Sequence, residues 1–182
     1  MVQVRQTEIA GCFMIKPTVF RDLRGNFRET FNKATLEKAL GYAVDFVQDN
    51  QSISHKHVLR GLHFQQGNHA QAKLVRVVRG SVLDVVVDLR KESPTFGHHV
   101  SVELTEDNGM MFFMPRGMAH GFMALEDQTV CCYKCDGYYH PGSEAGIIFD
   151  DPDLGIDWGV PNSELIVSDK DLNLPTFKEL YP

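Results

Sequence analysis

The sequence predicts an all-β fold, a sandwich or barrel of short strands. After Val58 the chain is a succession of strand-forming runs of five to eight residues, and Gly, Pro, Asp or Asn residues separate them. Only one segment in the first half, Lys33 to Leu40, has a convincing helical pattern. With 182 residues, we expect a single domain over residues 1–182, long enough to bury a substantial core.

The N-terminal segment is expected to hold two short strands joined by a turn. Strand-forming residues run from Phe13 to Phe20, with a break at Pro17. A turn over residues 22–25 leads into alternating side chains over residues 27–31. Three arginines lie within residues 21–28. They are either a solvated basic edge that discourages strand pairing or part of a site for an anion.

The helix is predicted over Lys33 to Leu40. Leu36 and Leu40 are spaced i, i+4 and therefore share one face, and Gly41 is a natural stop. After the helix, Val44 to Asp49 is a strand candidate that runs into a polar stretch.

The second half is dominated by strands. In the run from Val82 to Leu89, the odd-numbered residues form one apolar face, while Asp84 and Asp88 lie on the other. The tail after residue 150 is polar and rich in turns, with a short segment at Pro175 to Leu180. The strands predicted after Val58 are Val58 to Phe64, Lys73 to Arg79, Val82 to Leu89, His99 to Leu104, Met110 to Met114, Gly121 to Leu125 and Thr129 to Cys135.

Composition narrows the classes of function. The formal charge of −6 argues against nucleic acid or an anionic membrane as the main partner, although a local basic cluster still permits a small anionic ligand. No apolar run approaches the roughly 18 residues of a membrane span. The first eight residues lack the apolar region of a signal peptide, so a cytoplasmic location is the simplest expectation.

Three clustered cysteines raise the hypothesis of a zinc site. Side chains alternate along a strand, so Cys131 and Cys132 would point apart, as would Cys132 and Cys135. No second CxxC pair is present to complete a ligand set. We therefore expect buried, reduced thiols and no metal site.

The stretch from Val58 to Gln65 holds the strongest chemical signal. Arg60 and His63 interrupt a run of strand-forming residues, and imidazole titrates near neutral pH, so His63 is a candidate catalytic base. A hydrogen-bonded core histidine is the alternative. In a regular strand Arg60 and His63 would point to opposite faces. Either Gly61 marks a bulge that turns one of them, or Arg60 reaches its ligand from the strand's edge.

Two segments resemble the motifs of the cupin superfamily, which are small β-barrels of the jelly-roll type. Gly61 and Gly80 match the ends of the first motif, G-x5-H-x-H-x3or4-E-x6-G. The second motif, G-x5-P-x-G-x2-H, is matched at Gly109, Pro115, Gly117 and His120. The resemblance implies a cupin-type jelly-roll barrel with a few short peripheral helices.

The departures from these motifs concern metal binding. The positions of the usual ligands are occupied by Gly67, His69, Lys73 and His120. Two ligands are missing, and a lysine replaces the carboxylate. A cation at this place opposes binding of a divalent metal, so the sequence predicts a cupin that works without one.

A wider resemblance covers almost the whole chain. In order along the sequence, the matching stretches are Asp22 to Glu29, Gln48 to Asn50, Val58 to Gln65, Ala70 to Val75, Asp88 to Arg90, Ser93 to Gly97, Pro115 to Phe122, Tyr138 to Pro141, Asp150 to Pro152 and Ser168 to Asp171. Together they resemble the dTDP-4-dehydrorhamnose 3,5-epimerase family. The resemblance implies an isomerase that needs no cofactor and inverts C3 and C5 of dTDP-4-dehydro-6-deoxy-D-glucose, a step in dTDP-L-rhamnose biosynthesis.

The resemblance assigns four catalytic positions. His63 matches the base, and Asp171 matches the carboxylate that orients it. Tyr133 matches the acid, since a phenol with a reference pKa of about 10 stays protonated at neutral pH. Lys73 matches the cation that stabilises the enolate, although a tyrosine at a barrel mouth or a lysine reaching solvent would otherwise be ordinary.

The remaining matches concern binding of the dTDP-4-keto-6-deoxysugar. They are Arg24, Arg60 and Lys170 for the diphosphate, Gln48, Asn50, Glu29, Glu144 and His120 for polar contacts, and Tyr139 and Phe27 for the thymine. In this family the N-terminal segment reaches a neighbouring subunit. The resemblance therefore implies a homodimer in which Arg24, Phe27 and Glu29 act across the interface.

Three alternatives remain open from the sequence. A sister epimerase acting at one carbon, or on a related dTDP-4-keto-6-deoxysugar, would use the same base and acid. A non-catalytic cupin that binds sugar nucleotides would keep the pocket without the chemistry. A metal-dependent cupin oxygenase would contradict the interpretation of Lys73.

Overall fold

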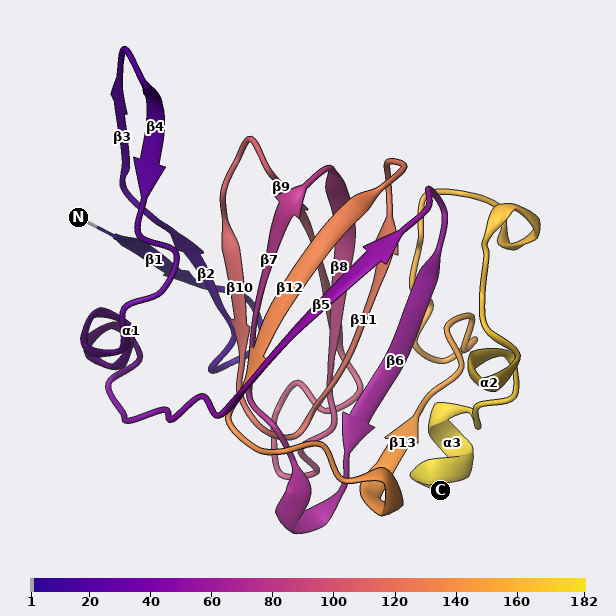
Figure 1. Cartoon of the computed structure of the whole chain (residues 1–182). Helices are drawn as coiled ribbons and strands as arrows, with labels where there is room; N and C mark the ends of the chain where they lie inside the picture. The colour runs from indigo at the N-terminus through magenta and orange to yellow at the C-terminus, as the bar shows by residue number, and fades with distance from the viewer. Residues whose placement is uncertain (1) are drawn as a thin grey trace.

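The computed structural model describes residues 2–182 and consists mainly of two antiparallel sheets that face each other (Figure 1). The six strands of the first sheet are, in spatial order, β1 (Gln3–Gln6), β2 (Phe13–Lys16), β10 (Met111–Met114), β7 (Lys73–Arg79), β12 (Thr129–Cys135) and β5 (Gln48–Ser54). The five strands of the second are β13 (Glu144–Gly146), β6 (Leu59–Gln65), β11 (Met118–Ala124), β8 (Ser81–Asp88) and β9 (His99–Thr105). The predicted all-β fold is confirmed.

The remaining elements lie around this barrel. The hairpin of β3 (Val19–Asp22) and β4 (Gly25–Arg28) projects away from both sheets (Figure 1). The helices are α1 (Lys33–Leu40), α2 (Asp169–Leu172) and α3 (Phe177–Leu180), with single 3₁₀ turns at Gly67–His69, Pro141–Ser143 and Asn162–Glu164. No helix in residues 2–182 is long and apolar enough to cross a membrane.

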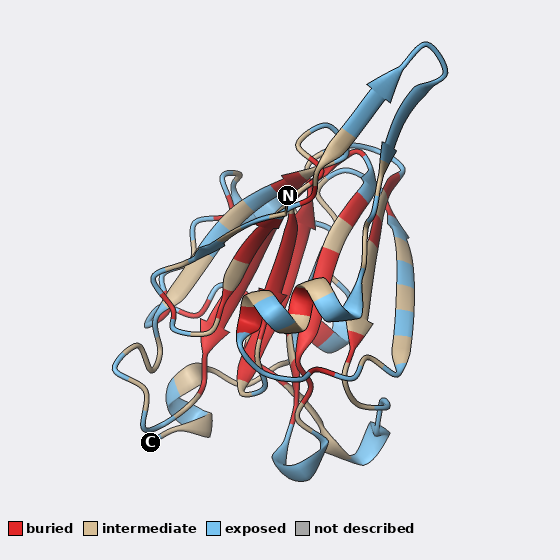
Figure 2. Ribbon diagram, turned by 90° about the vertical axis from the view of Figure 1, so that its left-hand side faces the viewer, coloured by how far each residue is buried: buried red, intermediate tan, exposed pale blue. Residues whose placement is uncertain are grey.

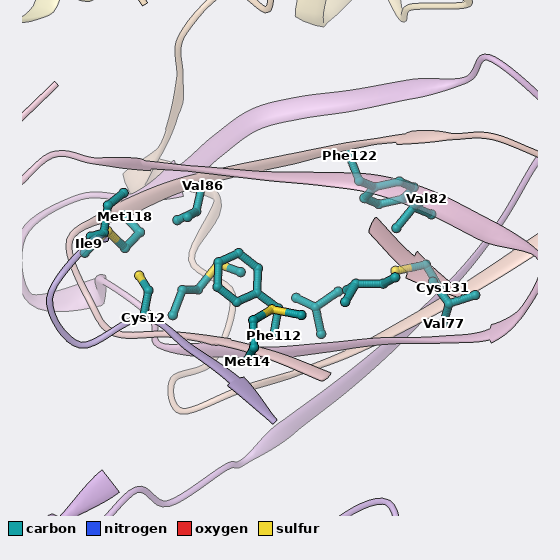
Figure 3. Packing of buried hydrophobic residues seen from close by; sticks show 13 residues of the cluster. Ile9, Cys12, Met14, Val77, Val82, Val86, Phe112, Met118, Phe122 and Cys131 are labelled. Atoms are coloured by element: carbon teal, nitrogen blue, oxygen red, sulfur yellow. The ribbon is translucent and has the colours of Figure 1, made fainter. Parts of the chain in front are cut away.

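The core lies between the two sheets, where the buried residues concentrate (Figure 2). Val82 and Val86 of β8 face Met14 and Phe112 of the opposite sheet (Figure 3). Full burial of a side chain of this size contributes about 1.5–3 kcal/mol to folding. These contacts make the barrel wall a rigid support for polar residues placed on the same strands.

The other face of the five-stranded sheet is also covered. Val85 and Val87 of β8 pack against the segment after β13, including Phe149 and Trp158. The indole of Trp158 donates a hydrogen bond of 2.9 Å to the carbonyl of Phe149 and so pins that segment. The predicted two faces of β8 are therefore both buried, and the C-terminal tail is the reason.

Helix α1 has the predicted bounds and covers the outer face of the six-stranded sheet. Asn32 caps it by accepting the backbone N–H of Thr35, and Gly41 ends it with a φ of 81°. Leu36 and Leu40 are buried in a cluster with Phe113. The apolar spacing seen in the sequence is thus the packing surface of the helix.

Some predicted strand bounds were wrong. The strand expected over Val44 to Asp49 is in fact β5, from Gln48 to Ser54. Val44 and Phe46 pack beside α1 instead of pairing in the sheet. The structure places β11 three residues earlier than Gly121, and β4 ends at Arg28. Apolar content misled the prediction because β5 is a polar strand that lines a cavity.

The cysteines are all free thiols. Cys131 lies in the core between the sheets, and Cys132, on the opposite face of β12, is half-buried. Within residues 2–182, no cluster of three or more His, Cys, Asp or Glu residues has the arrangement of a metal site.

Candidate active site

One cavity of about 830 Å³ opens between β5, β6, β7 and β12 and extends to α2. It gathers most of the predicted site residues, which come from segments more than a hundred residues apart. The predicted residues that line it are Gln48, Asn50, Arg60, His63, Lys73, His120, Tyr133, Tyr139, Glu144, Lys170 and Asp171. Arg24, Phe27 and Glu29 do not line it in this single chain.

A register shift explains how Arg60 and His63 serve one cavity. His63 pairs with His120 and Arg60 pairs with Phe122, so three steps on β6 match two on β11. At Gly61, inside the shift, φ is +135° and the peptide bond to Leu62 is cis. A Cβ on Gly61 would lie 2.5 Å from the Cα of Gly121, so only glycine fits here. Of the two alternatives left open by the sequence, the structure shows the bulge at Gly61, and both side chains line the same cavity.

His63 and Asp171 form a pair at the rim of the cavity, called the rim pair below. Nε2 of His63 lies 2.7 Å from Oδ1 of Asp171, and the side chains are 30% and 5% exposed. Asp171 also accepts the backbone N–H of Gly61. Burial acts to raise the pKa of Asp171, but the hydrogen bond and charge of His63 outweigh it and hold that pKa below its usual range. Asp171 therefore orients the His63 ring through Nε2 and leaves the other ring nitrogen, Nδ1, outside this contact.

Asp171 is held by local capping. Ser168 caps α2, since its hydroxyl accepts the backbone N–H of Asp171 at 3.2 Å. The four-residue helix therefore fixes the carboxylate against β6.

Tyr133 and Lys73 come from the opposite sheet. Tyr133 lies on β12 and Lys73 on the neighbouring β7, with Nζ of Lys73 5.8 Å from the centre of the Tyr133 ring. Burial raises the pKa of the Tyr133 phenol. Burial lowers the pKa of the Lys73 ammonium, with Cys135, Asp84 and Glu144 acting in the opposite direction. A phenol that keeps its proton and a buried lysine therefore line the same cavity.

A second histidine–aspartate pair lies deeper and is called the buried pair below. Nε2 of His120 lies 2.9 Å from Oδ2 of Asp84, and the side chains are 6% and 0% exposed. His120 lines the cavity, whereas Asp84 lies behind it. The two histidines are direct cross-strand neighbours on β6 and β11.

The mouth of the cavity carries a charged network. Oε2 of Glu144 accepts hydrogen bonds of 2.7 Å from both the Tyr139 hydroxyl and Nζ of Lys170. Burial acts to raise the pKa of Glu144, but these two donors lower it. Arg60 donates from Nε to the hydroxyl of Ser54 at 3.2 Å. Arg60 and Lys170 thus line the cavity together with Lys73, in a protein whose formal net charge is −6.

The polar strand β5 supplies amides to the wall. Gln48 donates to Oδ1 of Asn50 at 3.0 Å, and its own Oε1 accepts the backbone N–H of Tyr139 at 2.9 Å. Gln48 therefore holds the loop that carries the Tyr139 ring.

The three predicted residues outside the cavity lie on or just after the β3–β4 hairpin. Arg24 is exposed and pairs with Asp22 at 2.6 Å, while Phe20 and Phe27 are exposed with rings 6.5 Å apart. Glu29 follows β4 and accepts a hydrogen bond from Asn32. In the isolated chain, these residues resemble the solvated basic edge considered from the sequence.

Sequence reasoning missed Asp84 and Ser168 as parts of the site. Asp84 carried a signal, because a charged residue in the middle of an apolar strand calls for a buried partner. Ser168 precedes a helix too short to be recognised from periodicity. Only the fold shows that each supports a cavity-lining residue.

Comparison with known proteins connects this geometry to a family. The model of the dTDP-4-dehydrorhamnose 3,5-epimerase family matches residues 6–179. The dTDP-4-dehydrorhamnose 3,5-epimerase of Methanothermobacter thermautotrophicus is 49% identical, over 96% of this chain and 94% of that protein.

Solved structures agree with the sequence comparison. The 3,5-epimerase of Legionella pneumophila, in complex with dTDP-4-keto-L-rhamnose, has a TM-score of 0.93 and 43% identity, covering 98% of this chain and 94% of that one. ChmJ of Streptomyces bikiniensis, a 3'-monoepimerase in complex with dTDP-quinovose, has a TM-score of 0.86 and 35% identity, covering 93% and 85%. On the extent of these matches, the chain belongs to the dTDP-4-dehydrorhamnose 3,5-epimerase family.

Proposed function

We propose that this protein epimerises dTDP-4-dehydro-6-deoxy-D-glucose at C3 and C5 to give dTDP-4-dehydro-L-rhamnose. One observation carries the proposal: the candidate base and the candidate acid come from opposing sheets. His63 projects from the five-stranded sheet and Tyr133 from the six-stranded one, and both line the cavity. Inversion of a carbon needs this arrangement, with one group on each side of the sugar.

His63 acts as the base. Its Nε2 is bound to Asp171, so Nδ1 takes the proton from the carbon next to the C4 ketone. The C–H electrons form the enolate double bond, and the carbonyl electrons move to the C4 oxygen. The ionised Asp171 stabilises the resulting imidazolium.

Tyr133 acts as the acid. Its phenol gives a proton to the opposite face of the same carbon, which restores the ketone in the inverted configuration. The raised pKa of Tyr133 keeps this proton in place before reaction. His63 then releases its proton to solvent and Tyr133 takes one up from solvent. The same removal and return of a proton at the other carbon α to the ketone completes the double inversion.

Lys73 stabilises the enolate oxygen. A buried ammonium interacts with a developing anion far more strongly than an exposed one, and a single donor in such a site contributes about 3–4 kcal/mol. Arg60 and Lys170 are the cations available for the diphosphate, and the Tyr139 ring is available to stack on thymine.

The decisive experiment follows deuterium from D₂O into the sugar. We expect label at both C3 and C5, with formation of the L-rhamno product. Label at one carbon alone would contradict the double inversion and favour the single-carbon alternative, which the similarity to ChmJ keeps relevant. The absence of label at both carbons, with the nucleotide sugar still bound, would instead indicate a binding protein.

The active form is a homodimer in which the β3–β4 hairpin of each copy completes the other's site. The exposed aromatic rings of Phe20 and Phe27 on this projecting hairpin support this part of the proposal, because they are 62% and 68% exposed in the single chain. We also expect the protein in the cytoplasm, as the sequence indicates.

A mixing experiment tests the exchange of hairpins. His63→Asn and Phe27→Ala proteins, each nearly inactive alone, are unfolded and refolded together. Each mixed dimer then has one site with both an intact base and an intact hairpin. Statistical mixing predicts recovery of about a quarter of wild-type activity. No recovery, with mixed dimers demonstrated by differential tagging, would show that the hairpin acts on its own chain.

A further inference from the structure

We propose that Asp84 is a positioning residue for the reaction: it holds Nε2 of His120 from the sealed side of the cavity, so that Nδ1 of the same ring is presented to the C4 oxygen of the substrate. The inference rests on the proposed function and deepens it, because it assigns His120 a second donor role beside Lys73.

The burial of Asp84 has no evident structural purpose. It is 0% exposed and lies on the inward face of β8, between Val82 and Val86. Its Oδ2 is bound by His120, but its Oδ1 is buried without a partner among the described residues. A carboxylate taken out of water with a single hydrogen bond costs several kcal/mol.

Asp88 on the same face of β8 shows what a structural aspartate looks like here. It is also fully buried, yet its two oxygens accept from Arg90, Ser93 and Thr95 at 2.6–2.8 Å. Those bonds fix the loop after β8. Asp84 has no comparable set of partners. His120 is its only hydrogen-bond partner among the described residues, and its charge also acts to raise the pKa of Lys73.

The ring of His120 has one occupied nitrogen and one available nitrogen. Nε2 is bound to Asp84, whereas Nδ1 has no hydrogen-bond partner among residues 2–182. Since His120 is only 6% exposed and lines the cavity, the open side of its ring is the cavity side. Nδ1 is therefore available to a bound ligand.

The surroundings of His120 are those of the reacting centre. His120 lies opposite His63 on the neighbouring strand, and its ring centre is 6.5 Å from that of Tyr133. A donor between base and acid is well placed for the oxygen of the carbon that both of them flank.

The charge of Asp84 decides what His120 can do. An ionised carboxylate accepts a hydrogen bond from the Nε2–H group and stabilises a ring that also carries a proton on Nδ1. This Nδ1–H group donates to the enolate oxygen. Without the negative charge, the neutral ring keeps its proton on Nε2 and turns an Nδ1 lone pair toward the enolate. That arrangement repels the charge that develops in the transition state.

Asp84→Asn tests the proposal, because the amide oxygen can still accept from Nε2 while the charge is gone. We expect kcat to fall about 100-fold, as for loss of one transition-state donor, with KM within about twofold. We expect the melting temperature to stay equal or to rise, because a poorly satisfied buried charge has been removed.

Asp88→Asn is the matched control on the same strand face. We expect it to lower the melting temperature while kcat per folded molecule stays unchanged, since Asp88 does not line the cavity. If Asp84→Asn behaves like this control, destabilised and fully active, Asp84 is structural and the proposal is wrong.

A double-mutant cycle shows whether Asp84 acts through His120. In a His120→Ala background, Asp84→Asn should cost less than about twofold further in kcat, because the ring it positions is gone. Full additivity would overturn the proposal. Wild-type protein that fails to exchange either carbon would overturn the proposed function itself, and this role with it, whereas wild-type exchange with unchanged Asp84→Asn activity overturns the role alone.

Discussion

The rim pair and the buried pair place two histidine–aspartate contacts on neighbouring strands, yet their surroundings differ. His63 is 30% exposed and is held by a carboxylate from α2, a short helix in the C-terminal tail. His120 is 6% exposed and is held by a carboxylate from the barrel wall. The same chemical pair therefore occurs once at the cavity's edge and once with its histidine on the lining and its aspartate behind it.

The difference matches two kinds of work. A base must release its proton to water after each turnover, so it needs access to solvent. A group that only stabilises charge needs fixed geometry and a low dielectric, and exposure would weaken it. Burial thus separates the histidine proposed to transfer protons from the one proposed only to donate a hydrogen bond.

The largest expected effect is on the two histidines themselves. His63→Asn should lower deuterium exchange at both carbons by about 10³-fold or more, because the base is lost. His120→Asn should lower it by about 10²-fold and leave both carbons labelled, because one donor is lost. Measured rates of exchange at C3 and C5 check this. Equal losses in the two variants would remove the distinction between the pairs.

The next effect separates proton removal from inversion. Tyr133→Phe leaves the rim pair intact but removes the acid from the opposite sheet. Product formation should fall by about 10²- to 10³-fold. Exchange into recovered, uninverted substrate should persist, because His63 can return a deuteron to the face it came from. NMR of the recovered sugar gives both quantities, and parallel loss of exchange and inversion would contradict the assignment of Tyr133.

A smaller effect is expected at the orienting carboxylate. Asp171→Asn should lower kcat about 10- to 100-fold, as for loss of a group that acts through its neighbour. The pKa of Asp171 is lowered in the folded protein, so its contribution to stability is present above the unfolded pKa of about 4 and is lost as pH falls through the folded value. The free energy of unfolding, measured as a function of acid pH, should therefore depend less on pH in the variant than in the wild type. The same slope in both proteins would contradict this expectation.

The smallest effect is a change in the alkaline profile. Burial lowers the pKa of Lys73, so its ammonium deprotonates below the usual range of about 10.4 and kcat should fall there as pH rises. In the same window the unfolded chain binds more protons, so stability should rise with pH. Lys73→Arg cannot deprotonate, and its alkaline limb should move upward. If the alkaline limb of Lys73→Arg lies at the same pH as in the wild type, another group causes the loss of activity.

The sequence was a good guide wherever a local pattern decides the structure. The bounds of α1, β7 and β12 follow from i, i+4 spacing or alternation. The conflict between Arg60 and His63 left a bulge at Gly61 as one of two alternatives, and the fold was needed to decide between them. The polar strand β5 was misplaced because its inward side chains line a cavity and carry no apolar signal.

Long-range contacts within the site were beyond local patterns. Residues 63 and 171 are 108 positions apart, and only the resemblance to a family joined them before the fold was known. Asp84 was assigned with Asp88 to the second face of its strand, and its partner lies 36 residues away on β11. A pattern on one strand shows that a partner is needed and cannot say which one.

Because α2 carries Asp171, we expect enzyme activity to depend on whether the C-terminal tail is packed in place. Both sheets are complete at Gly146, whereas Asp171 arrives only when the tail has packed over Val85 and Val87. A protease that cut the turns near Gly155 or Gly159 and released the tail would remove the orienting carboxylate from an otherwise assembled barrel. Loss of enzyme activity would then precede loss of the β-sheet signal in circular dichroism, and this order would identify the tail as the first part of the molecule to fail.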